Sequence, residues 1–154
     1  MPCLTFSKSI AAFPEKVFEA AADFRNAPGR IRGIKKIEML TDGPVRVGTK
    51  FKETRVMFGK EATETMEVVA FNPPHGYTLG CESHGCRYRT EFRFAPNAQG
   101  TTVEVTFEAT PRTFASKVLG FLMAPMIKGV RKCMEKDLDD LGASIEGKPV
   151  AAAR

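Results

Sequence analysis

Hydrophobic and polar residues alternate along most of this chain with a period of two, the pattern of strands that bury one face. Residues 4–10 form the first such segment. Pro14 then opens a short helix, because its fixed φ suits a first helical position. The buried stripe of that helix is formed at helical spacing by Val17, Phe18, Ala21 and Ala22. Asn26-Ala27-Pro28-Gly29 ends the helix, and a second short helical turn is expected after it.

The chain from residue 34 to residue 111 predicts a succession of strands joined by short turns. The expected ranges are 34–40, 50–57, 61–71, 77–83, 86–94 and 101–111. Asn72-Pro73-Pro74-His75-Gly76 is the strongest turn signal, since neither proline can donate to a ladder. Consecutive strands with short connections imply an antiparallel meander, so the first strand and these six make a sheet of about seven strands.

A two-residue turn at His84-Gly85 predicts how the strands on either side of it pair. Counting outward, the expected pairs are Ser83 with Cys86, Cys81 with Tyr88, Leu79 with Thr90, and Tyr77 with Phe92. One face of the sheet is then mainly apolar. The next strand, 101–111, continues this face with Val103, Val105, Phe107 and Ala109. The other face carries the charged residues and is exposed to water. The apolar face needs a cover.

The segment from residue 113 to residue 145 is the expected cover, as one long helix. Apolar residues recur in it every four positions, at Val118, Leu122, Met126, Val130, Met134 and Leu138. Pro125 should kink this helix or mark a restart within it. We expect a single domain over residues 1–147 and a flexible tail over residues 148–154.

The order of strand, two short helices, six strands and long final helix resembles the helix-grip fold of the START-like (SRPBCC) superfamily. Within that superfamily the chain resembles the polyketide cyclase/dehydrase branch more narrowly. Three stretches of sequence carry the resemblance. They are residues 10–18, where a strand runs into a proline-started helix; Val69-Ala70-Phe71-Asn72-Pro73-Pro74; and the final helix from Leu122 to Glu146 with its proline.

The resemblance implies an α+β fold in which a curved antiparallel sheet wraps around the C-terminal helix and leaves a cavity for a hydrophobic ligand. It implies binding or transport of a lipid, a sterol-like molecule or an aromatic polyketide-like molecule, with a polyketide cyclase/dehydrase-type enzyme as the alternative. No cofactor is expected. The residues expected to line the cavity are Phe24, Met66, Leu79, Cys81, Tyr88, Thr90, Phe92, Val105, Phe107, Val118, Phe121, Leu122 and Met126.

Candidate catalytic residues are few, and no recognisable catalytic motif is present. Tyr88 is the best of them, because its phenol faces inward and could donate a hydrogen bond to a ligand carbonyl. Glu53 and Arg55 come next: they face inward as a pair if Phe51 and Met57 do, or lie in water if a bulge reverses the strand. We favour the solvated arrangement, because an unpaired buried charge is very costly. His75 and His84 are expected at exposed loop tips.

Composition excludes several other classes of protein. The chain has 154 residues, 43% hydrophobic, which suits one folded domain and argues against disorder. Its longest apolar stretch is about half of a membrane span. A net charge of +5 and a basic cluster near Arg30 predict a solvated face and not a nucleic-acid site, because aromatic residues are not interleaved with the basic ones.

The four cysteines, Cys3, Cys81, Cys86 and Cys133, match no zinc spacing, and no metal site is expected. The amino terminus does not read as a signal peptide, so we expect thiols in a reducing cytoplasm.

The expected oligomeric state is a monomer or weak homodimer. A protein-interaction domain, using the basic cluster or the exposed sheet, is the third functional class to consider.

Overall fold

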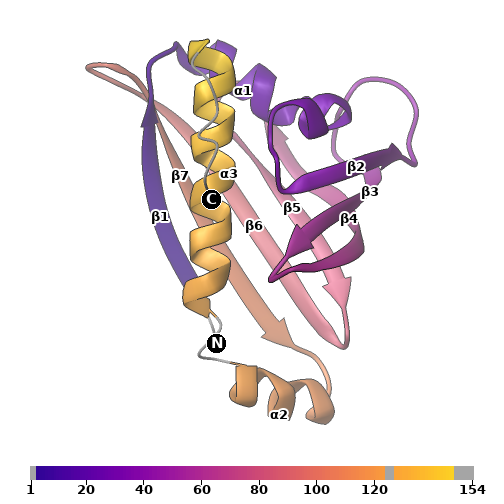
Figure 1. Ribbon diagram of the computed structural model, residues 1–154. Coiled ribbons are helices and arrows are strands. Elements are labelled where there is room, and N and C mark those ends of the chain that lie inside the picture. The colour runs from indigo at the N-terminus through magenta and orange to yellow at the C-terminus, as the bar shows by residue number, and fades with distance from the viewer. Residues whose placement is uncertain (1–2, 124–126, 148–154) are drawn as a thin grey trace.

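The computed structural model describes residues 3–123 and 127–147 and shows a seven-stranded sheet with helices packed on one face (Figure 1). The elements follow the predicted order. They are β1 (Cys3–Ile10), α1 (Pro14–Ala22), the 3-10 helix η1 (Phe24–Gly29), β2 (Ile34–Met39), β3 (Lys50–Met57), β4 (Lys60–Asn72), β5 (Gly76–Ser83), β6 (Cys86–Asn97), β7 (Gly100–Pro111), α2 (Phe114–Met123) and α3 (Ile127–Glu146). The α+β helix-grip fold is confirmed.

Strands β2 to β7 form an antiparallel meander, and β1 is added beside β7. Their order is β1-β7-β6-β5-β4-β3-β2, so β1 pairs with β7 at one edge. The register predicted from the His84-Gly85 turn is confirmed, with Ser83 opposite Cys86 and Cys81 opposite Tyr88. The turn holds because both residues adopt a positive φ.

The core lies between the concave face of the sheet and the helices α1 and α3. Phe51, Val68 and Val103 are fully buried on the sheet, and Leu138 and Leu141 bury the inner face of α3. An aromatic cluster fills the end near α1, where Phe18 contacts Phe71, Tyr77 and Phe94 at ring-centroid distances of 5.4–5.9 Å. In Figure 1 α3 crosses the sheet as a single rod, and α2 lies apart from it, below the end of β7.

The described residues of the expected cover segment form two helices, α2 and α3, which agrees with the predicted restart and not with a single kinked helix. Pro125 and Met126 lie outside the described residues, as does the side chain of Leu122. Arg112 donates its backbone N–H to the Gly85 carbonyl at 2.8 Å, which ties the start of α2 to the β5–β6 turn. Thr113 and Ser116 then cap α2 reciprocally, each side-chain oxygen accepting the other's backbone N–H at 3.0 Å.

Candidate functional site

A cavity of ≈ 400 Å³ lies between the concave face of the sheet and α3, and its lining is predominantly apolar. Among the sequence-predicted ligand residues, the structure brings nine to its wall: Phe24, Met66, Leu79, Cys81, Tyr88, Thr90, Phe92, Val105 and Phe107. Eight of them, all except Phe24 of η1, share one face of the sheet because opposed residues in β4, β5, β6 and β7 point the same way.

Two of the predicted ligand residues are placed elsewhere. Val118 and Phe121 belong to α2, where their side chains are 46% and 82% exposed and do not line the cavity. The physical reason is that α2 ends at Met123 and its start is attached to the β5–β6 turn. Together these features direct α2 away from the sheet.

The helical wall of the cavity contains a residue that the sequence analysis missed. Val130, Met134, Asp137 and Leu141 line the cavity from α3 at helical spacing. Asp137 is therefore a carboxylate in an apolar stripe. That interruption of the stripe was the available sequence signal.

Asp137 completes a buried charged cluster with Glu53 and Arg55, which we call the charged corner. Arg55 Nε donates to Glu53 Oε1 at 2.8 Å, and Arg55 Nη2 donates to Asp137 Oδ2 at 3.0 Å. All three side chains line the cavity and are at most 20% exposed. The favoured prediction that Glu53 and Arg55 are solvated is wrong. The β3–β4 register runs without a bulge from Lys50 to Met57, so period two carries both residues inward with Phe51.

The electrostatics of the charged corner follow from its composition of two carboxylates and one guanidinium. Burial alone would lower the pKa of Arg55, but Asp137 and Glu53 together raise that pKa above its usual value, so Arg55 stays charged. Burial raises the pKa of Asp137 to about 6, against the attraction of Arg55. Arg55, shared between two carboxylates, does not offset the effect of burial, so Asp137 takes up a proton as the pH falls through about 6.

A second polar group lies on the sheet wall at the β5–β6 turn. Ser83 Oγ is 2.9 Å from Glu64 Oε1 and 2.7 Å from His84 Nδ1. His84 is exposed, as predicted, yet it also lines the cavity. Burial, together with the Glu64 carboxylate, raises the pKa of Cys81 to about 11, so its thiol stays protonated and is a poor nucleophile.

Tyr88 and Thr90 supply neutral hydrogen-bonding groups to the same wall. The Tyr88 ring stacks on Phe107 with centroids 5.8 Å apart. Burial, with smaller effects of Cys86 and Glu64, raises the pKa of Tyr88 to about 12. Its phenol is therefore protonated at neutral pH and able to donate a hydrogen bond to a ligand.

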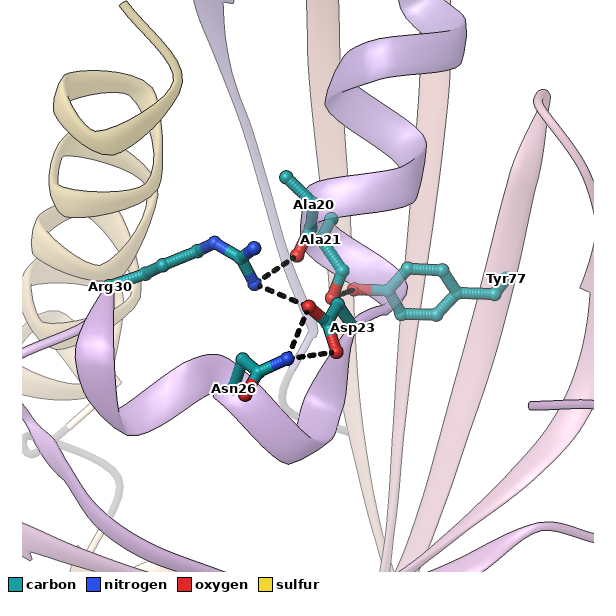
Figure 2. Close-up of polar contacts among 6 residues, drawn as sticks. All are labelled: Ala20, Ala21, Asp23, Asn26, Arg30 and Tyr77. Atoms are coloured by element: carbon teal, nitrogen blue, oxygen red, sulfur yellow. Dashed lines mark hydrogen bonds and ion pairs between the residues drawn. The ribbon is translucent and has the colours of Figure 1, made fainter. Parts of the chain in front are cut away.

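The end of the cavity near α1 is held by a network of polar contacts (Figure 2). Tyr77 donates its hydroxyl to the Ala21 carbonyl at 3.4 Å, and Arg30 Nη1 donates to Asp23 Oδ2 at 3.0 Å. Burial would raise the pKa of Asp23, but hydrogen bonds from Asn26 and Arg30 lower it below its usual value. These contacts join α1, η1 and β5. Tyr77 and Arg30 line the cavity, while the Tyr77 hydroxyl and Arg30 Nη1 are engaged in these contacts.

The four cysteines are all free in the structure. Over residues 3–123 and 127–147, no group of three or more His, Cys, Asp or Glu side chains is arranged to hold a metal ion. Within the same ranges, no helix is both long and apolar enough to span a membrane.

Comparison with solved structures finds the same fold in proteins of low sequence identity. A Thermus thermophilus protein shares 20% identity at a TM-score of 0.78, over 95% of this chain and 98% of its own. The Zhui aromatase/cyclase from Streptomyces shares 17% identity at a TM-score of 0.77, over 94% of this chain and 93% of its own. The di-domain ARO/CYC StfQ from the steffimycin biosynthetic pathway shares 14% identity at a TM-score of 0.76, over 94% of this chain and 50% of its own.

Among curated protein sequences, none matches this chain. The sequence pattern of one protein family does match, over residues 1–146, and so covers both walls of the cavity and the charged corner. The chain belongs to the polyketide cyclase/dehydrase and lipid transport family.

Proposed function

We propose that this protein binds, and in the cell transports, a small hydrophobic molecule in the cavity between the sheet and α3. The observation that carries the proposal is a predominantly apolar cavity of ≈ 400 Å³ with one charged corner. Ligand sites combine apolar walls with a small number of placed polar groups, and their volumes start at about 300 Å³. Membership of a family that includes lipid transport supports the same function.

The charged corner restricts the chemistry of the ligand. Arg55 is already engaged by two carboxylates, so it offers little net attraction to an anion. Aromatic and sulfur-containing side chains, among them Phe92, Phe107 and Met134, line the rest of the cavity. A neutral molecule with an aromatic or polycyclic body and a carbonyl or hydroxyl group at one end fits both regions.

Binding of a neutral apolar fluorescent probe, N-phenyl-1-naphthylamine, to Thr90→Phe tests this proposal. Thr90 lines the cavity, so the added ring should reduce probe affinity about tenfold or more while leaving the melting temperature unchanged or higher. Thr65→Phe is the matched control, because Thr65 is exposed and lies next to the inward-facing Met66. A wild-type protein that takes up no probe, together with a Thr90→Phe variant of sharply lower melting temperature, would overturn the proposal. Mass spectrometry of molecules extracted from the native protein then identifies the ligand.

Cyclase or dehydrase chemistry is the second candidate, and the titration of Asp137 favours it. A carboxyl group with a pKa of about 6, inside an apolar cavity and beside a guanidinium, is suited to general acid–base work. Arg55 and the protonated Tyr88 would donate hydrogen bonds to a carbonyl that is being enolised. Enolisation of an aryl 1,3-diketone, followed by its enol absorbance, should be faster with the wild type than with Asp137→Asn. Equal rates would exclude Asp137 as the acid–base group.

The free cysteines also support the expected compartment. We propose that the protein works in a reducing cytoplasm, where thiols persist. We propose further that it acts as a monomer or weak homodimer.

A further inference from the structure

Helix α2 presents large hydrophobic side chains to solvent. Phe114 and Phe121 are each 82% exposed, and Val118 and Leu119 are 46% and 48% exposed. We call these four residues the α2 patch. Isolated exposed apolar residues are normal, but Phe114, Val118 and Phe121 recur at helical spacing and share one face of this ten-residue helix. Leu119 extends the exposed apolar surface beside them, and such clustering is typical of an interaction site.

The chain around the α2 patch is strongly basic. Residues 112–134 contain five basic residues and no acidic residue, although the whole chain has 18 acidic residues. Arg112, Lys117, Lys128 and Lys132 are exposed, and Arg131 pairs with Glu135 at 2.8 Å. The α2 patch therefore combines exposed apolar side chains with a local excess of positive charge.

The α2 patch lies at the same end of the molecule as one end of the cavity. Arg112 is hydrogen-bonded to Gly85, and the neighbouring His84 lines the cavity. Val130, in the first turn of α3, lines it as well. Figure 1 shows α2 at the opposite end of the sheet from α1. A partner bound to α2 would therefore lie close to the cavity.

We propose that the α2 patch docks the protein on the surface of an anionic lipid bilayer. An interfacial helix inserts Phe and Leu side chains into the boundary between headgroups and acyl chains, and nearby Lys and Arg residues contact anionic headgroups. The absence of acidic residues over 112–134 favours such a surface over a mixed-charge protein partner. This docking goes beyond the proposed ligand binding and does not depend on it. If both hold, the cavity receives its ligand at the bilayer.

Co-sedimentation of the full chain with vesicles tests the docking. Vesicles of phosphatidylcholine and phosphatidylglycerol should bind the wild type, and raising the salt concentration or using phosphatidylcholine alone should weaken binding about tenfold. The double variant Phe114→Ser/Phe121→Ser should bind the anionic vesicles at least about tenfold more weakly. Both side chains are 82% exposed, so the variant should keep the wild-type melting temperature.

Two matched controls separate the α2 patch from general surface properties. Phe13→Ser removes a phenylalanine that is 78% exposed next to α1, and it should leave vesicle binding unchanged. Lys128→Glu/Lys132→Glu and Lys35→Glu/Lys36→Glu change the net charge equally, at exposed positions in α3 and β2. Only the α3 pair should reduce binding to anionic vesicles by about tenfold.

Three results would overturn the docking proposal. The first is no binding of the wild type to anionic vesicles, and the second is an equal loss of vesicle binding in the control variants and in the α2 and α3 variants. The third is a wild-type protein that is dimeric when the Phe114→Ser/Phe121→Ser variant is monomeric, since a second copy would then cover α2. Uptake of N-phenyl-1-naphthylamine in solution is measured separately. Failure of docking therefore leaves a working cavity, and failure of the cavity leaves vesicle binding intact.

Discussion

Replacing Asp137 by Asn should change how the stability of the fold depends on pH. The pKa of Asp137 is raised by burial from its ordinary 3.8 to about 6. The folded protein therefore holds this proton more tightly than the unfolded chain. Its contribution to stability is fully present below about pH 3.8 and is lost as the pH rises through about 6. Asn keeps the size and an oxygen acceptor for Arg55 but carries no charge at any pH.

The expected magnitude follows from the size of the pKa difference. A tenfold change in proton affinity corresponds to about 1.4 kcal/mol, so the wild type should lose about 3 kcal/mol relative to Asp137→Asn between acidic and neutral pH. This figure is an upper value, because the Asp137 side chain is 20% exposed and solvent screens part of the interaction.

Urea unfolding of both proteins at several values between about pH 4 and about pH 7 measures the effect. At each pH the carboxylates remote from Asp137 contribute equally to both proteins and cancel in the difference, whereas Glu53, which shares Arg55 with Asp137, remains part of it. Asp139→Asn is the matched control, since Asp139 lies on the same helix, is 46% exposed and pairs with Lys8 at 3.3 Å. Its difference from wild type should vary by less than about 0.5 kcal/mol. A flat difference for Asp137→Asn, or one of opposite sign, would refute the argument that one guanidinium cannot satisfy both carboxylates.

Two further substitutions test the frame of the cavity. Phe51→Ala removes a fully buried ring that stacks on Phe24 at 4.6 Å, and it should lower the free energy of unfolding by about 3–5 kcal/mol in urea titrations. Gly100→Ala should lower the melting temperature by several degrees, because Gly100 has a φ of 149° and a Cβ there would lie 2.6 Å from the Ile10 carbonyl oxygen. Gly29→Ala, where a Cβ meets nothing within 4 Å, should change it little.

The parts of the structure that sequence predicts well are those governed by local periodicity. Alternation located all seven strands, and the two-residue turn at His84-Gly85 was enough to give the pairing from Ser83 to Tyr77. Both depend on neighbours along the chain or across one tight turn. A register error of one residue would have exchanged the two faces of the sheet, so the turn alone determined which side chains line the cavity.

The charged corner could not be predicted in the same way, because its third member lies far along the chain. Arg55 and Asp137 are 82 residues apart and meet only when α3 packs across the sheet. From their own strand alone, Glu53 and Arg55 were expected in water, because burial of an unpaired charge is very costly. The prediction that Val118 and Phe121 of α2 line the cavity was wrong for a related reason. Apolar spacing identifies one face of a helix, but it does not show whether that helix stays on the sheet.

The charged corner also explains how the fold tolerates a cavity of this size. An apolar cavity of ≈ 400 Å³ left dry would cost about 10 kcal/mol at the rate measured for engineered voids, which is comparable to the whole stability of a domain. Polar cavities are hydrated instead, because water finds hydrogen-bond partners in them. Glu53, Arg55 and Asp137 provide such partners at one wall. A ligand with a polar group at one end can replace that water at the charged corner, while its apolar body covers the remaining surface. Under the proposed function, the three residues that offer hydrogen-bond partners to water in the free cavity would also orient the polar end of the ligand.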